Sequence, residues 1–172
     1  TSNHGPGTVY QAQASELANF AAIAGSSLTA NAFATVSGLA ENTLQYLRVR
    51  ALSLNPPTPD GPWTTVGSAS TLANAPSAAA SPFTLVGVAS VTVAWTALPL
   101  APANLACEGY LAELSESPAF TTIIRSSAVA PGAAAANLDG LRFGTLYYAR
   151  VASLDREGNP NLMSIRAVRK FR

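Results

Sequence analysis

The side chains of this chain that could do acid–base, nucleophilic or metal chemistry are few and scattered. Glu113 and Glu116, two of its nine carboxylates, are three positions apart on an expected strand and its turn, so they point to different faces and do not form an acid–base pair. His4 has no Cys, Asp or His at metal-ligand spacing. Cys107, the single cysteine, lies in an apolar stretch, which favours a small buried residue over a reactive or intermolecular thiol. The sequence therefore predicts a protein that is not an enzyme and has no metal and no cofactor.

A repeated pattern of aromatic and cationic side chains is the remaining candidate for binding. The pattern Tyr46-x-Arg48-x-Arg50 returns as Tyr148-x-Arg150. Alternate residues of a strand share a face, so each set forms a row on the outer face of one strand. Such a row is typical of cross-strand packing between long side chains, and the alternative is a strip that binds a glycan or a polyanion.

Composition limits the partners further. Charged residues make up 11% of the 172 residues and the net charge is +1, whereas roughly 25% charged residues is usual. So weak a field gives no electrostatic basis for binding nucleic acid or a membrane surface. The chain has no apolar run of the roughly 18 residues that a membrane helix needs, so no membrane insertion is expected. It opens on a turn-like segment without an initiator Met or a signal peptide, and we expect a processed piece of a larger protein.

The elements that position these side chains come from a tandem repeat. Residues 9–20 return 100 positions later as residues 109–120, with Tyr, Ala, Ser, Glu and Phe in register. Residues 42–49 return at a shift of 102 as residues 144–151, so the second copy gained two residues in between. A repeat of about 100 residues is too long for a solenoid unit and matches one small domain.

Strand signals dominate both copies, because short runs of alternating apolar residues are separated by Gly, Pro and Asn. In the second copy Val91, Val93 and Trp95 fall on one face of a strand, which makes Trp95 a core anchor. The sequence predicts an all-β chain, with seven strands in this copy. These are residues 83–86, 91–95, 110–114, 122–125, 135–138, 145–154 and 163–171.

These residues resemble the fibronectin type III domain. The core Trp95 at the end of a strand and the frame Gly140-Leu141, Thr145, Tyr147, Ala149 and Val151 carry the resemblance over about residues 80–172. The first copy repeats the frame, but Gln45 stands where the family has Tyr, and both copies lack the family's Pro between Leu and Thr. The resemblance implies two tandem immunoglobulin-like β-sandwich modules of the seven-strand type. Residues 1–75 form an incomplete module with strands C to G only, and residues 76–172 form a complete one.

The missing strands of the first module are the main functional clue. The module begins at its third strand and has no counterpart of Val91, Val93 and Trp95. The expected strand 32–36 would lack its neighbour and would present unpaired backbone groups. Covering the exposed face with two strands would be worth about 10 kcal/mol at about 25 cal/mol per Å². The residues left facing open space, and therefore the candidate partner contacts, are Tyr10, Ala12, Ala14, Leu47, Val49 and Ala51.

Two explanations of the incomplete module stay open. The chain is a fragment that lost its first strands through cleavage, disorder or the choice of boundaries, or another subunit or a detached part of the same polypeptide supplies them by strand complementation. Complementation between subunits is head-to-tail and would build a filament. The partner is then a protein, either copies of this chain or the missing part of its own polypeptide.

The remaining segments are loops and connections. Residues 69–82 are expected to be the last strand of the first module and a short linker. The loops 55–62 and 155–160 are favoured as solvated turns, although the resemblance implies that the second lies where binding members of the family make contacts.

The sequence thus predicts a non-catalytic structural or adhesive segment of a larger extracellular surface or filament protein of bacterial origin. The alternative is a spacer or carbohydrate-binding accessory region of a secreted polysaccharide-degrading enzyme. A neighbouring catalytic domain would favour the second interpretation, and further repeats or self-association would favour the first. An intracellular scaffold is a third interpretation, with only the reduced Cys107 in its favour.

Overall fold

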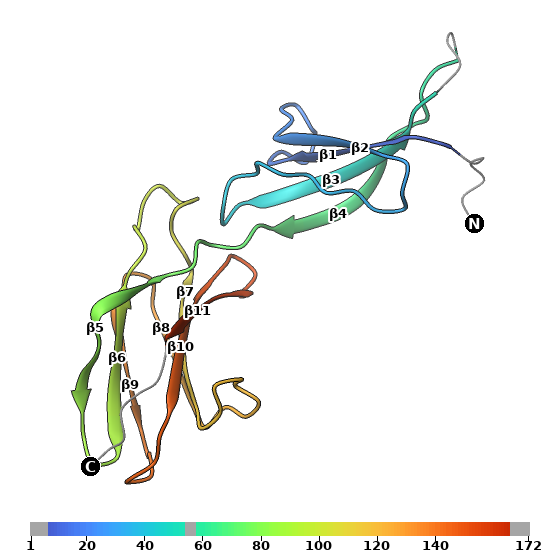
Figure 1. The fold of residues 1–172 in the computed structure, drawn as a ribbon. Helices are drawn as coiled ribbons and strands as arrows, with labels where there is room; N and C mark the ends of the chain where they lie inside the picture. Colours follow the sequence, from blue (N-terminus) through green and yellow to red (C-terminus); the bar gives the residue numbers. More distant parts are fainter. Residues whose placement is uncertain (1–6, 54–57, 166–172) are drawn as a thin grey trace. The chain divides into compact units, whose positions relative to one another are not determined.

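The computed structural model describes residues 7–53 and 58–165, with side chains up to Leu162 in the last strand. Eleven strands, β1 to β11, occur in these residues (Figure 1). The chain divides between Thr71 and Leu72 into two compact units, here called unit 1 and unit 2. In the part of the chain that the structure describes, no helix is long and apolar enough to cross a membrane.

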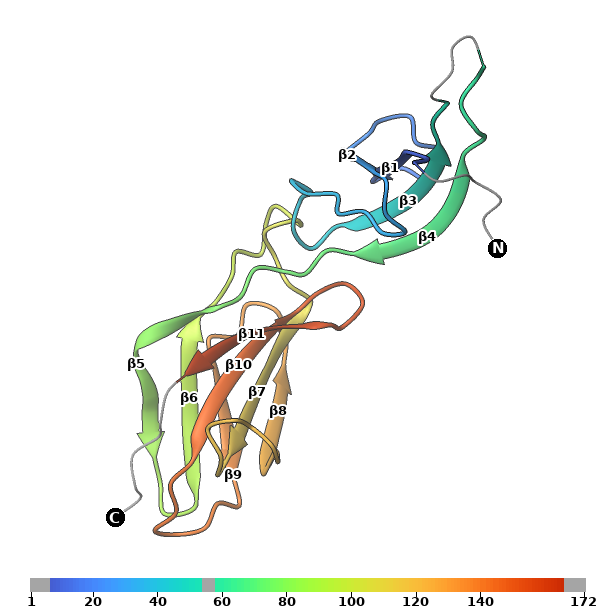
Figure 2. The same ribbon diagram turned by 45° about the vertical axis from the view of Figure 1, so that its right-hand side comes forward.

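Unit 2 is a sandwich of two antiparallel sheets, seen as two layers in Figures 1 and 2. The three-stranded sheet has the order β5-β6-β9, formed by Ser77–Val86, Ser90–Thr96 and Ala135–Asp139. The four-stranded sheet has the order β11-β10-β7-β8, in which chain order gives β7 (Gly109–Ser115), β8 (Arg125–Val129), β10 (Tyr148–Leu154) and β11 (Pro160–Ile165). The predicted all-β, immunoglobulin-like sandwich is confirmed for this unit.

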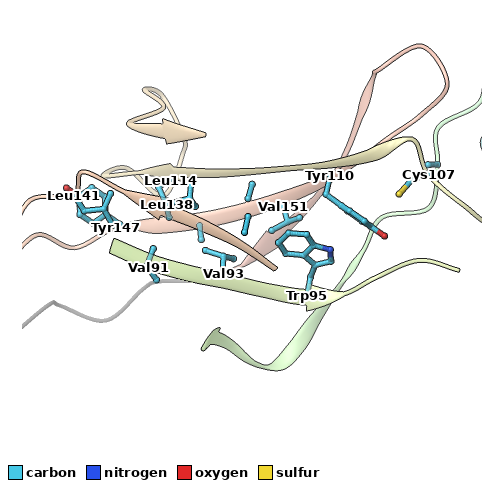
Figure 3. Packing of buried hydrophobic residues seen from close by; sticks show 14 residues of the cluster. Val91, Val93, Trp95, Cys107, Tyr110, Leu114, Leu138, Leu141, Tyr147 and Val151 are labelled. Carbon is cyan, nitrogen blue, oxygen red and sulfur yellow. The ribbon is translucent and has the colours of Figure 1, made fainter. Parts of the chain in front are cut away.

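The core of unit 2 lies between the two sheets, as Figure 3 shows. Strand β6 contributes Val91 and Val93, both 0% exposed, and Trp95 at 2%. Period-two alternation sends these side chains to one face, where they meet the inward residues of β7 and β10. Trp95 is therefore the core anchor that the alternation predicts.

Unit 1 has a single antiparallel sheet in the described residues. Its order is β2-β1-β3-β4, where chain order gives β1 (Tyr10–Ser15), β2 (Gly25–Thr29), β3 (Leu44–Ala51) and β4 (Thr64–Ser70). Strand for strand, this sheet repeats β8-β7-β10-β11 of unit 2. Nothing in the described part of unit 1 corresponds to β5 and β6.

Several expected boundaries in unit 2 are wrong. The edge strand expected at 122–125 lies at Arg125–Val129, because residues 116–124 form turns and bends, with Phe120 at a φ of 51°. The strand expected from Thr145 begins only at Tyr148, and the last strand begins at Pro160, inside the expected loop. The linker expected within residues 69–82 is also wrong from Ser77 on. Strand β5 begins at Ser77, which pairs with Thr96 at the end of β6.

The segment 32–36 of unit 1, expected to be a strand, forms no strand in the structure. Its counterpart in unit 2 is β9, which pairs with β6 along its length, for example Val93 with Ala136. A strand needs a hydrogen-bonded neighbour, and unit 1 offers none at this place. The absence of this strand is thus a direct result of the missing one.

Candidate functional site

The predicted contact residues of unit 1 come together on one face of β1 and β3. In the antiparallel register Tyr10 lies opposite Ala51, Ala12 opposite Val49, and Ala14 opposite Leu47. Directly opposite residues share a face of the sheet. We call this the open face, and it also includes Gln45, two positions before Leu47 on β3.

The open face is less buried than its counterpart in unit 2. In unit 2 the five residues at the matching positions, Tyr110, Ala112, Leu114, Ala149 and Val151, are all 0% exposed. In unit 1, Ala14 is 0% exposed, but Tyr10, Ala12, Leu47 and Val49 are only half-buried. The buried apolar cluster of the described residues starts at Ala73 and includes no residue of unit 1. Unit 1 therefore has an apolar face without a core.

The chain before β3 contacts the edge strand of this sheet. A Cβ atom added to Gly25 on the edge strand β2 would lie 2.6 Å from a methyl carbon of Val36 and 3.2 Å from one of Leu39. Only glycine admits these two side chains at such a distance. The Thr71 hydroxyl donates a hydrogen bond to the carbonyl of Ala40 at 2.6 Å. These contacts hold residues 36–40 against β2 and Thr71. The apolar residues Tyr10, Ala12, Leu47 and Val49 of β1 and β3 nevertheless remain half-buried.

Gln45 is a buried polar residue on the open face. It is 2% exposed, and neither its Oε1 nor its Nε2 has a hydrogen-bond partner in the structure. In unit 2 the matching residue is Tyr147, whose hydroxyl accepts a hydrogen bond from the amide of Arg142 at 3.0 Å. The sequence marks Gln45 as a departure from the family pattern, but only the structure shows that its amide is both buried and unsatisfied.

The opposite face of unit 1 carries the predicted aromatic and cationic row. The Arg48 guanidinium lies 4.2 Å from the ring centroids of both Phe20 and Trp63, and it donates two hydrogen bonds to Oε1 of Gln13, at 3.0 and 2.7 Å. Cation–π contacts of this kind hold aromatic rings against a sheet. Tyr46, the first residue of the row, is half-buried on the same face.

Arg50 is satisfied in the same way. It forms an ion pair with Asp60 at 3.0 Å, donates to Gln11 Oε1 at 2.9 Å, and lies 4.6 Å from the Trp63 ring. Both arginines thus cover aromatic rings and use their donors within the unit, which is the cross-strand packing favoured by the sequence. They hold the start of β4 and the loop after β1 against the sheet.

The row in unit 2 is built alike from different partners. Arg150 Nε lies 2.6 Å from Oε2 of Glu113, which is directly opposite in the register of β7 and β10. Its guanidinium lies 4.5 Å from the Phe120 ring centroid. Tyr148 is half-buried on the same face. Sequence reasoning missed these partners of the arginines. Two-residue alternation on neighbouring strands could have located Gln11, Gln13 and Glu113, whereas Phe20, Trp63 and Phe120 lie outside the strands and gave no such signal.

The described residues contain no group of three or more His, Cys, Asp or Glu side chains that could hold a metal ion. His4 lies outside the described residues. Cys107 is 5% exposed. Burial, and after it the Cys107 side chain, raises the pKa of Tyr110 to about 12. A depression of about 370 Å³ in unit 2 has Glu116 as its single ionisable residue and is otherwise lined by Ser115, Ser117, Thr121, Thr122 and Ile124.

Comparison with known proteins gives similarity of fold. No family model and no curated protein matches the sequence. Among solved structures, the FN1–FN3 domains of chicken CNTN1 are 16% identical, over 96% of this chain and 58% of that one, with a TM-score of 0.44. A segment of two fibronectin type III domains from chicken tenascin is 15% identical, over 92% and 83%, with a TM-score of 0.47. The FN3 domain of human collagen XX is 21% identical, over 56% and 100%, with a TM-score of 0.38.

The chain thus spans little more than half of the CNTN1 structure. All three matches are fibronectin type III domains, two of them in tandem. The fold itself is established by the strand order of unit 2, three strands facing four, and unit 1 repeats the four-stranded half of it.

Proposed function

We propose that this chain is a non-catalytic structural or adhesive segment of an extracellular surface or filament protein, and that the open face of unit 1 binds strands supplied from outside these 172 residues. The donor is the missing part of the same polypeptide or another copy of it. The contacts of the open face with the donor are made by Tyr10, Ala12, Ala14, Leu47 and Val49.

The observation that carries the proposal is the single sheet of unit 1. A sheet with one apolar face must bury that face against a second layer to form a stable domain. In unit 2 the second layer is β5-β6-β9. In the described part of unit 1 only Ala14 is a fully buried apolar residue. Covering the open face in the same way supplies unit 1 with the core that unit 2 already has.

The donor can act in two geometries that have different consequences. Strands from the same polypeptide complete unit 1 as an ordinary module in a chain of modules. Strands from another copy join copies head to tail, which produces an open filament unless the contacts close a ring. The low charge of the chain, 11% Asp, Glu, Lys and Arg, weakens repulsion between copies packed side by side.

The test combines assembly state with local stability. The polypeptide purified from its source is examined by negative-stain electron microscopy and intact mass, and hydrogen exchange is compared between it and the isolated 172-residue chain. We expect fibres or a longer polypeptide, with β1 and β3 protected as strongly as β7 and β10. In the isolated chain β1 and β3 should exchange at least about a hundredfold faster than β7 and β10, because unit 1 opens locally.

Equal protection of the two units in an isolated monomeric chain would contradict the proposal, because unit 1 would then need no donor. The matched internal control is unit 2, whose exchange should be the same in both preparations.

A further inference from the structure

We infer that the donor segment carries a hydroxyl or amide side chain where unit 2 carries Val91, and that this side chain bonds to Gln45. The inference rests on the proposed function, since it names the chemistry of the segment that covers the open face. The inference also excludes the β5–β6 hairpin of another copy's unit 2 as the donor.

Unit 2 shows which part of the donor lies near Gln45. The amide of Leu141 donates to the carbonyl of Ala89 at 2.9 Å, just before β6 begins, and Val91 pairs with Leu138. The next amide along, that of Arg142, donates to the Tyr147 hydroxyl. Tyr147 and Val91 belong to one buried cluster and lie at the same end of the core (Figure 3). The start of the second donor strand therefore meets the side chain at position 147, or 45 in unit 1.

In unit 1 the side chain at that place needs partners. Gln45 is 2% exposed with its Oε1 and Nε2 unsatisfied, and it is shorter than the tyrosine that it replaces. A buried polar group without a hydrogen bond is costly, whereas the same group with a partner is not. An aliphatic side chain in the donor would leave the buried amide without a hydrogen-bond partner. A Ser, Thr, Asn or Gln there both accepts from Nε2 and donates to Oε1.

A second copy of unit 2 does not fit this requirement. Its β5–β6 hairpin presents Val91 to this position, and the hairpin is already part of its own core, with Val91 and Val93 at 0% and Trp95 at 2% exposure. Donating it would expose these side chains and unfold unit 2. The donor is thus a separate segment with the same apolar alternation and a polar residue at the start of its second strand.

The experiment supplies unit 1 with a donor of known sequence. A copy of residues 77–108 is joined directly to Val9 of the chain, which places its strands as β5 and β6 stand before Gly109. Two versions of the added copy are compared, one unchanged and one with Val91→Thr, which keeps the shape and adds a hydroxyl. Each is made with Gln45 and with Gln45→Leu. The measurement is hydrogen exchange of β3 amides in all four chains, with β10 as the control.

With Gln45 we expect the Val91→Thr version to protect β3 about tenfold more than the unchanged version, the effect of one buried hydrogen bond. With Gln45→Leu the order should reverse, because the hydroxyl then lacks a partner. If the two versions protect β3 equally in the Gln45 chain, or rank the same in both backgrounds, the inference about Gln45 is wrong while the proposed function stands. If neither version protects β3 in either background, the open face does not accept strands and the proposed function itself fails.

Discussion

The indole ring of Trp95 on β6 and the phenol ring of Tyr110 on β7 lie with their centroids 5.2 Å apart and their planes tilted by 49°. The two strands belong to different sheets, so this contact joins the layers of unit 2. Trp95 Nε1 is buried without a hydrogen-bond partner. The indole therefore contributes through its apolar area and its ring contact rather than through its N–H group.

Trp95→Ala should destabilise unit 2 by about 3–5 kcal/mol, the usual cost of removing a large buried aromatic side chain. Trp95→Phe should cost much less, because it keeps a ring against Tyr110 and loses no hydrogen bond. Urea unfolding followed by circular dichroism measures both free energies. Leu100, which is 69% exposed, provides the control, since Leu100→Ala should change stability by less than about 0.5 kcal/mol.

Tyr110 makes the stability of unit 2 sensitive to alkali. Burial first, and then the Cys107 side chain, raise its pKa to about 12 from 10.0. The unfolded phenol ionises at about pH 10, whereas the folded one keeps its proton up to about pH 12, so stability is fully present below pH 10 and falls as the pH rises toward 12. Denaturation at a series of pH values, with absorbance at 295 nm to follow the phenol, measures this loss.

Tyr110→Phe is the matched variant for this dependence. It should flatten the loss of stability between pH 10 and pH 12, and it should cost about 1 kcal/mol at neutral pH because the Leu98 amide, which donates to the Tyr110 hydroxyl at 2.6 Å, loses its acceptor. An equally steep loss in Tyr110→Phe would show that another group is responsible.

Tyr147 should stabilise unit 2 through its hydroxyl. Tyr147→Phe removes the acceptor of the Arg142 amide, 3.0 Å away, and we expect a loss of about 1–2 kcal/mol. The amide of Arg142 should exchange faster in this variant, while amides in β7 keep their rates. Unchanged exchange at Arg142 would mean that the hydrogen bond contributes nothing.

The ion pair of Arg150 and Glu113 should be sensitive to salt. Glu113→Gln gives unit 2 the amide that Gln13 offers to Arg48 in unit 1, and we expect a cost of about 0.5–1 kcal/mol at low salt that shrinks as salt is added. Glu116, just after the same strand, forms no ion pair with any residue that the structure describes, so Glu116→Gln serves as the control. Chemical denaturation at low and high NaCl concentrations measures both variants.

Residues 72–76 should contribute to the stability of unit 2. Asn161 Nδ2 donates to the Ala73 carbonyl at 2.8 Å, and the Ser153 hydroxyl donates to the Asn74 carbonyl at 2.6 Å. Residues 72–172 made alone should unfold in one cooperative transition. Residues 77–172 should be less stable by about 2 kcal/mol, because two hydrogen bonds and the buried Ala73 are lost. Thermal unfolding of the two chains, run in parallel, checks this, and equal stability would contradict it.

The sequence predicts the sandwich and its core because the alternation of apolar and polar residues indicates which side of each strand is buried. Val91, Val93 and Trp95 could be placed on the core face from spacing alone. The repeat also allowed the strands of unit 1 to be compared with those of unit 2, since one copy acts as a template for the other. The sequence therefore predicts which strand positions face the core and which strands of one copy correspond to those of the other.

Strand ends and side-chain partners were less predictable. Small polar residues at Ser77–Pro82 are typical of a linker, yet they form part of β5, an edge strand whose register shifts between Ala78 and Phe83. Edge strands pair on one side only and tolerate such irregularity. The burial of Gln45 could not be predicted either, because a Gln in a strand gives no local sign of burial.

The register of unit 1 also determines how this unit carries a mechanical load. Tyr10, at the start of β1, lies at the Ala51 end of β3, whereas Ser70, at the end of β4, lies opposite Leu44 at the other end. Tension applied between Tyr10 and Ser70 is therefore directed along the strands, and it loads the hydrogen bonds on both sides of β3 in shear, many at once. Peeling, which would break them one after another, is the weaker mode that this arrangement avoids.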